Sequence, residues 1–255
     1  MIDTHAHIYL KELASERATI IERAKVAGIQ RIYMPAIDSS EVDSLIETEE
    51  QYPDFCLAMM GLHPCYVKEN YQDELALVEY WLGKRKFAAV GEIGLDRYWD
   101  RTYDHLQMEA FQKQMEWALL YDLPVVIHTR EAMEATIDAV IPFAERGLKG
   151  IFHCFGGNEE QAVRIIRMGF CLGIGGVVTY KKSGLAEVLQ SGSIPLDALV
   201  LETDSPYLSP VPYRGKQNEP AYMPLVAQRL AEVKGLEVRE VIACTTRRAL
   251  EIFGK

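Results

Sequence analysis

The sequence predicts a TIM (β/α)8 barrel, an α/β fold in which eight parallel strands alternate with helices. Short apolar segments alternate with segments of helical periodicity along the whole chain. Such alternation is typical of right-handed βαβ units and a parallel sheet. The chain has 255 residues, and barrels of this kind run to about 250 residues as one unit. We therefore expect a single domain that spans residues 1–255.

Eight segments are expected to form the strands. Several of them are apolar nearly throughout, as expected for parallel strands that are buried on both faces. In chain order they are Met1–Thr4, Arg31–Ala36, Phe55–Leu62, Phe87–Leu95, Pro124–Thr129, Gly150–Phe155, Phe170–Gly176 and Ala198–Glu202.

The segments between these strands carry helix signals. In Asp104–Tyr121 the apolar residues recur at steps of three and four, which predicts one apolar stripe on a helix. Asn158 and Gln161 are spaced as a helix N-cap and its third-position partner. Two helices are expected near Tyr222–Lys234 and Glu237–Phe253, the second of them covering the barrel. Glycines that end helices are expected at Gly28, Gly147 and Gly169.

An open, doubly wound sheet is the alternative architecture. That fold usually has a glycine-rich turn after its first strand, where this chain has Thr4-His5-Ala6-His7. The glycine cluster Gly173–Gly176 lies elsewhere, so we expect it to serve backbone packing or a loop. The proline-rich segment Ser205–Met223 follows the eighth strand, where a barrel places substrate contacts, although it can also be a stiffened connector.

Composition and charge exclude several classes of protein. The sequence is 49% hydrophobic and 25% charged, which excludes disordered and fibrous proteins. Its net charge of −10 repels polyanions and disfavours a protein that coats nucleic acid, although a local site can still hold one phosphate. No segment approaches the roughly 18 apolar residues of a membrane span. No export signal is expected, and five cysteines without a CxxC motif do not indicate a disulfide framework, so we expect a cytoplasmic location.

Five of the six histidines follow predicted strands. His5 and His7 are two residues apart after the first strand, so both imidazoles project from the same side. His63, His128 and His153 end the third, fifth and sixth strands. Because the carboxyl ends of barrel strands meet around one mouth, these side chains are expected to converge. The remaining histidine, His105, lies in a predicted helix and is expected to be a surface residue.

Two carboxylates complete the candidate metal site. Glu92 interrupts the apolar run AAVGEIGLD, and Asp204 follows VLET at the end of the eighth strand. A charged side chain inside a buried strand needs a partner of opposite charge. For Glu92 this partner is expected to be a metal ion, with a buried arginine as the alternative. Asp96 is expected in the following loop, and the direction of Glu202 depends on whether its strand continues regularly.

This ligand set predicts a two-metal centre. Imidazoles and carboxylates without thiolates suit Zn, Mn or another first-row divalent ion, and six ligands exceed the needs of one tetrahedral site. A bridging carboxylate would let two ions share a water or hydroxide and present it as a nucleophile. Cys154 is next to His153, but on a regular strand its side chain points the opposite way, so we expect it to pack in the core.

The motifs that carry these residues resemble the TatD family of metal-dependent deoxyribonucleases, within the amidohydrolase superfamily. The resemblance extends in order from the first strand to the loop after the eighth. The matching motifs are DTHAH at 3–7, GLHP at 61–64, GEIGLD at 91–96, PVVIHTR at 124–130, FHCFGG at 152–157, ETDSPYL at 202–208 and RGKQNEP at 214–220.

The resemblance implies a metal-dependent hydrolase that cleaves phosphodiester bonds, with 3'-5' exonuclease-type removal of nucleotides from DNA ends. By similarity, His5, His7 and Asp204 would bind one divalent ion, His128 and His153 a second, and Glu92 would bridge the two. The ions would be Mg, Mn or Zn. Asp204 would also accept a proton from the attacking water, and His63 would face the scissile phosphate.

Substrate contacts are expected from residues near the mouth of the barrel. Arg130, Arg214, Lys216 and Asn218 are candidate donors to phosphate oxygens, with solvated surface positions as the alternative. Tyr98, Trp99 and Tyr207 are candidates for stacking a terminal base, with loop packing as the alternative. The acidic balance favours single-stranded DNA ends over long duplexes. No membrane and no obligate protein partner is indicated.

Two other functions remain open. The same centre attacks a carbonyl carbon as readily as phosphorus, so an amide or ester hydrolase such as an aminoacyl-tRNA deacylase is the first alternative. A non-catalytic metal-binding barrel is the second alternative. The presence of all six candidate ligands disfavours it.

Overall fold

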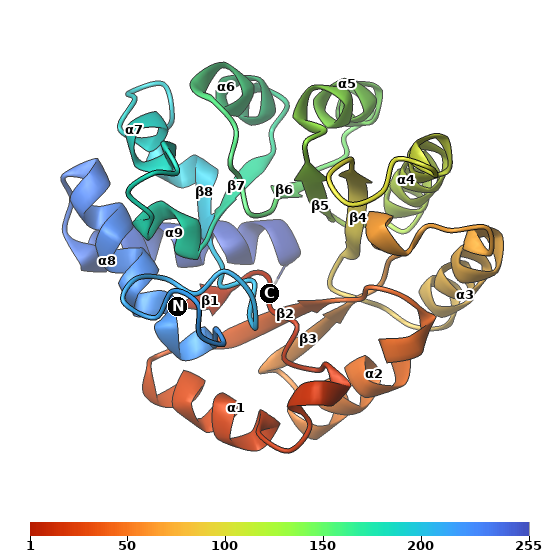
Figure 1. The fold of residues 1–255 in the computed structure, drawn as a ribbon, viewed down its shortest axis with the longest axis horizontal. Helices are drawn as coiled ribbons and strands as arrows, with labels where there is room; N and C mark the ends of the chain where they lie inside the picture. The colour runs from red at the N-terminus through yellow and green to blue at the C-terminus, as the bar shows by residue number, and fades with distance from the viewer. Residues whose placement is uncertain (255) are drawn as a thin grey trace.

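The computed structural model describes residues 1–254 and confirms the barrel, with the strands forming an inner ring and the helices lying outside them (Figure 1). The strands are β1 Ile2–Asp3, β2 Arg31–Pro35, β3 Cys56–Met59, β4 Val90–Asp96, β5 Val125–Arg130, β6 Gly150–Phe152, β7 Cys171–Ile174 and β8 Leu199–Leu201. Six of them lie inside the predicted segments. Only β4 and β5 run one residue further, to Asp96 and Arg130.

Nine α-helices belong to the described residues 1–254. They are α1 Arg17–Val26, α2 Val42–Gln51, α3 Tyr71–Lys84, α4 Asp104–Leu120, α5 Met133–Ala144, α6 Glu159–Arg167, α7 Leu185–Leu189, α8 Met223–Lys234 and α9 Val238–Phe253. None of them combines the length and the apolar character needed to cross a bilayer. The capping box of Asn158 and Gln161 at the start of α6 is confirmed. Gly28, Gly147 and Gly169 follow helices with positive φ, as predicted.

Hydrogen bonds close the ring of strands. All strand pairs are parallel, in the orders β1-β2-β3 and β4-β5-β6-β7-β8. A bridge between Met60 and Val90 joins the two groups on one side, and one between Ala6 and Ser205 joins them on the other. The N–H of Thr4 also donates to the carbonyl of Leu201 at 3.1 Å. Closure rules out the open doubly wound sheet.

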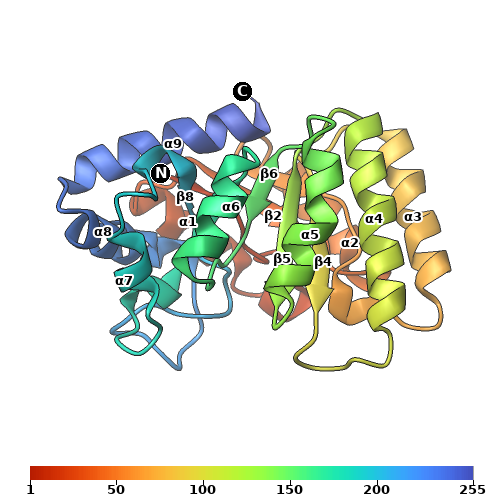
Figure 2. The same ribbon diagram turned by 90° about the horizontal axis from the view of Figure 1, so that it is seen from above.

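Helix α9 covers the amino-terminal end of the barrel, opposite the site. In Figure 2 it lies across one end of the strands. Residues Ala249, Leu250 and Phe253 of α9 pack in one cluster with Ile2, Tyr33, Met59, Ala89, Val126, Ile151, Cys171 and Val200 of the barrel. The rings of Phe253 and Tyr33 stack with centroids 3.8 Å apart. The inner cavity of the barrel is therefore filled at this end by apolar side chains.

Phe253→Ala is expected to destabilise the fold without altering the site. The change leaves a gap beside Tyr33, and we expect a loss of about 2 kcal/mol, below the range for a fully buried phenylalanine because this ring is only partly buried. Urea unfolding followed by circular dichroism checks this. Unchanged stability would show that α9 does not contribute to the barrel.

Candidate metal centre

The site lies at the carboxyl ends of the strands, where a cavity of 1380 Å³ opens. Barrel strands point their alternate side chains inward, so the last inward residues of several strands meet there. Residues lining the cavity include His7, His63, Glu92, His128, His153 and Asp204. The strand-end histidines converge as predicted, while His105 is exposed on α4.

Glu92 is at the centre of this cluster. Its side chain is 2% exposed and lies among five imidazoles, with oxygen-to-nitrogen distances of 2.8 to 3.5 Å. Oε2 faces His5 and His7 at 3.1 and 3.5 Å. Oε1 faces His153, His128 and His63 at 2.8, 2.9 and 3.4 Å. The two oxygens of one carboxylate thus face two separate groups of nitrogens, and no arginine pairs with Glu92 within residues 1–254.

The His5 and His7 group includes Asp204. The Nε2 atoms of the two histidines are 3.2 Å apart, and Asp204 Oδ1 lies 3.8 and 3.7 Å from them. Tyr9 donates its hydroxyl proton to the carbonyl of Pro35, so it accepts from His7 Nδ1–H. This leaves the lone pair of His7 Nε2 directed at the cluster, which is the form that binds a cation.

The second group contains His128 and His153. His128 lies between two carboxylates, with Nδ1 2.9 Å from Glu92 and Nε2 2.9 Å from Asp96. The predicted loop position of Asp96 is wrong. Strand β4 continues pairing with β5 as far as Asp96 and Arg130, so the side chain turns toward the site.

A backbone hydrogen bond holds His63 in one tautomer. Its Nδ1 accepts a hydrogen bond from the backbone N–H of Cys65 at 3.0 Å. The neutral ring therefore carries its proton on Nε2, which points to Glu92. In this state His63 is a hydrogen-bond donor at the edge of the cluster rather than a lone-pair ligand.

Burial and mutual charge decide the protonation of the site. Burial alone would raise the pKa of Glu92, but the imidazoles, His153 and His5 first, outweigh it and hold the pKa well below its ordinary value. Burial lowers the pKa of His5, which keeps this ring neutral. Burial also raises the pKa of Asp204 to about 6. Glu92 is therefore ionised. A buried carboxylate needs positive charge beside it, which either protonated imidazoles or a bound cation can supply.

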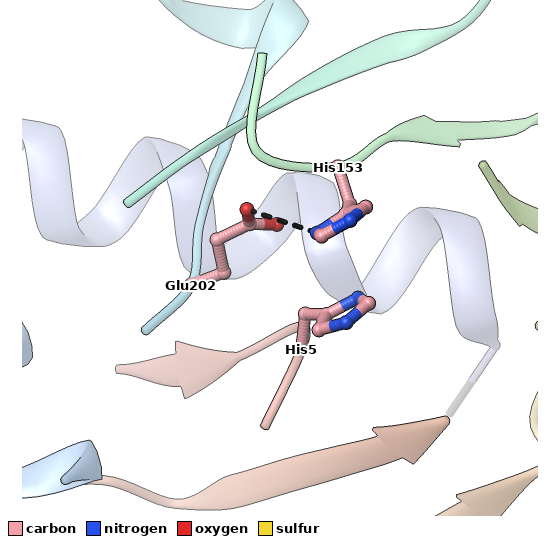
Figure 3. Close-up of side chains that lie close together, drawn as sticks. All are labelled: His5, His153 and Glu202. Atoms are coloured by element: carbon pink, nitrogen blue, oxygen red, sulfur yellow. Dashed lines mark ion pairs between the residues drawn. The ribbon is translucent and has the colours of Figure 1, made fainter. Parts of the chain in front are cut away.

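Glu202 and Cys154 take positions that strand alternation does not predict. Strand β6 ends at Phe152, and Cys154 follows in a left-handed conformation with φ 46°, so it lines the cavity instead of packing in the core. The N–H of Cys154 donates to Glu202 Oε1, which also lies 3.6 Å from His153 Nδ1 (Figure 3). His5 is the third member of this cluster. Three of its atoms, His5 Nδ1, His153 Nδ1 and Glu202 Oε2, are buried without a hydrogen-bond partner.

Gly173 makes room for the Glu202 carboxylate. A Cβ at this position would be 2.1 Å from Glu202 Oε2 and 3.0 Å from the Cα of His153. At Gly176 a Cβ would be 2.1 Å from the carbonyl oxygen of Leu208. The glycine cluster therefore serves close packing, as predicted.

The candidate substrate residues separate into two groups. Arg130, Arg214 and Lys216 line the cavity, and none forms an ion pair with a carboxylate of residues 1–254. Asn218 is buried, and its amide donates to the carbonyls of Thr203 and Tyr207 at 2.7 and 2.6 Å. The expectation that Asn218 contacts phosphate is wrong, because both its donors hold the loop after β8.

A closed barrel with imidazoles and carboxylates gathered at the carboxyl ends of its strands defines the class of metal-dependent hydrolases. The donor set fits divalent cations, because imidazole nitrogens and carboxylate oxygens are directed at the same points. The chain belongs to the family described as TatD related DNase, whose model matches residues 2–254. It is a hydrolase of ester bonds within that family.

The similarity to known proteins covers the full chain. An uncharacterized metal-dependent hydrolase, YabD of Bacillus subtilis, is 36% identical over 254 residues, which are 99% of this chain and 98% of the relative. A 3'-5' ssDNA/RNA exonuclease TatD of Pantoea ananatis is 29% identical over 258 residues, covering 100% and 99%. The crystal structure of the TatD homolog YJJV of Escherichia coli superposes with a TM-score of 0.93 at 28% identity, covering 100% of this chain and 98% of that one.

Glu202→Gln is expected to lower activity about 10- to 100-fold, the usual effect of removing a partner that orients metal ligands. The carboxylate accepts from the N–H of Cys154 and lies 3.6 Å from His153 Nδ1, and an amide presents a donor in place of one oxygen. Metal titration of the stripped protein checks this. The apparent metal affinity should fall with the activity, and an unchanged affinity would contradict an orienting role.

Proposed function

We propose that this protein is a nuclease that uses two divalent cations to release nucleotides from the ends of single-stranded DNA. The observation that carries the proposal is the Glu92 carboxylate, whose two oxygens face two separate groups of imidazoles. A bridging carboxylate is what a pair of adjacent cations requires. The exonuclease activity named for the Pantoea relative points to the same substrate class.

Each group supplies the ligands of one ion in this proposal. His5, His7 and Asp204 would hold the first ion and His128 and His153 the second, and Glu92 would contribute one oxygen to each. The ions would be Mg, Mn or Zn. When bound, such cations polarise a phosphate oxygen and lower the pKa of a nearby water.

The chain's own groups then handle protons and charge. An attacking water must lose a proton, and the Asp204 carboxylate, which lines the cavity beside His5 and His7, is the acceptor. His63 donates a hydrogen bond from Nε2 to a phosphate oxygen. It can do so because the N–H of Cys65 occupies Nδ1, which leaves the proton of the neutral ring on Nε2. Both act at the mouth of the barrel, within reach of a phosphate in the cavity.

Three cations at the cavity wall provide phosphate contacts. Arg130, Arg214 and Lys216 have no carboxylate partner among residues 1–254, in a chain whose net charge is −10. Their unpaired charge gives a local attraction for a phosphate backbone that the rest of the surface repels. A strand with a free end can enter such a cavity.

The test is nucleotide release from end-labelled single-stranded DNA. Metal-stripped protein is reloaded separately with Mg, Mn and Zn, and the products are separated on a denaturing gel, with labels at the 5' end and at the 3' end. Laddering from the 3' end that requires a metal supports the proposal. Absence of release with every metal, in protein shown to contain metal, would overturn it and direct the search to aminoacyl and peptide-like esters and amides.

A further inference from the structure

We propose that Tyr98 and Trp99 form a stacking platform for an unpaired nucleobase next to the scissile phosphate. This inference rests on the proposed nuclease function and names the part of the substrate that the rim of the site recognises. The two residues follow Arg97, the first residue after β4, at the carboxyl end of that strand.

The two aromatic residues at this position are open to solvent. Tyr98 is 49% and Trp99 69% exposed, and their ring centroids lie 4.9 Å apart in an edge-on arrangement. Trp99 lines the cavity that contains the cluster of histidines and carboxylates around Glu92. A tryptophan with this exposure is not packed in a core, so its face is available to a ligand.

Arg130 completes the platform with a positive charge. Its guanidinium lies 3.8 Å from the centroid of Tyr98 and 5.3 Å from that of Trp99. Neighbouring cations are neutralised: Arg97 pairs with Asp104 at 2.6 Å, and Arg101 with Glu131 at 3.5 Å. Arg130 has no such partner within residues 1–254, so its charge is available to a phosphate while the rings contact the base.

Asp96 connects this platform to the cluster of candidate metal ligands. Its Oδ1 accepts from the backbone N–H groups of Tyr98 and Trp99 at 2.9 and 3.3 Å. Its Oδ2 lies 2.9 Å from Nε2 of His128, a proposed metal ligand. One carboxylate thereby sets the position of the aromatic loop relative to the site of cleavage. A base on Trp99 is then held at a defined distance from the reacting phosphate.

The chemistry of the platform selects unpaired bases. Every base has a π-face, so stacking on an aromatic ring tolerates sequence and contributes about 1–3 kcal/mol per base. A base inside a duplex is already stacked between its neighbours and must be unpaired before it can contact Trp99. The platform therefore gives a preference for single strands without base-specific hydrogen bonds.

The first test compares two phosphodiesters in Trp99→Ala and Trp99→Phe. We expect Trp99→Ala to raise KM for single-stranded oligothymidylate by roughly 5- to 100-fold, the equivalent of one lost stacking contact. The difference in KM between the wild type and Trp99→Ala should disappear on a single-stranded oligonucleotide of abasic residues, which keeps the phosphate backbone and has no aromatic ring. Trp99→Phe should restore most of the oligothymidylate KM. Tyr80→Ala is the matched control, because Tyr80 is 55% exposed on α3 and lies outside the cavity.

The second test measures binding without cleavage. Fluorescein-labelled, phosphorothioate-linked oligothymidylate is titrated with metal-loaded protein, and Kd is read from anisotropy. A Kd that rises in Trp99→Ala and recovers in Trp99→Phe supports the platform. This result would hold even if the wild type released no nucleotides, because absence of release would overturn only the nuclease proposal. An equal Kd for wild type and Trp99→Ala, or an equal loss of activity on both phosphodiesters, would overturn the platform.

Discussion

Glu92→Gln is expected to abolish hydrolysis while the barrel stays folded. Glutamine has the shape of glutamate, but one oxygen becomes an amide that donates protons. The two Glu92 oxygens face two groups of imidazoles. In the variant, one of these groups faces an amide NH2 instead of a carboxylate oxygen. We expect kcat/KM to fall at least about 10³-fold, the size of effect seen when a preorganised charge partner is removed from a catalytic centre.

Metal analysis separates loss of the centre from loss of the fold. Glu92→Gln, purified and reloaded with Mn or Zn, should contain less metal than the wild type, with an unchanged circular dichroism spectrum. His105→Ala is the control, because this histidine is exposed on α4 and outside the cluster. A full metal complement and near-normal turnover in Glu92→Gln would refute a bridging role, and a large loss of metal in His105→Ala would show that the ligands are misassigned.

Asp204→Asn is expected to stop turnover by a different route. Asp204 has a positive φ of 56°, a conformation that asparagine also adopts, so the backbone should be preserved. The amide oxygen can still face His5 and His7, but the side chain cannot take up a proton. We expect kcat to fall about 10²- to 10⁴-fold, the usual contribution of a general base.

The two site variants should differ in metal content. Asp204→Asn is expected to retain the ion held by His128 and His153 and to bind the other more weakly, whereas Glu92→Gln weakens both. Asp54→Asn is a matched control, since Asp54 is exposed and also left-handed, with φ 65°. Full activity in Asp204→Asn would show that the proposed centre is not the catalytic one.

The positions of the strands could be predicted because both faces of each barrel strand are buried. Apolar runs, nearly continuous in several of the eight segments, therefore mark the strands, and closure of the ring follows from their number and from the helices between them. The ends of the strands do not follow from the apolar runs alone. The last pair of a strand depends on its neighbour, and β4 reaches Asp96 only because β5 continues to Arg130 beside it.

The sequence also determined which residues meet at the mouth, since His5, His7, Glu92 and Asp204 each belong to, or closely follow, an apolar strand. It did not determine how neighbouring side chains point once the strands stop. Asn218 turned inward to hold the loop after β8.

Only the tertiary structure decided the second set of contacts around the histidines. Glu202 lies behind His153, and Cys154 leaves the core for the cavity, since β6 has ended by Phe152. Asp96 joins His128 to the backbone of Trp99. Periodicity in a sequence reports which face of an element is buried, whereas these contacts link separate elements whose spacing is set by packing and by backbone turns outside the regular strands.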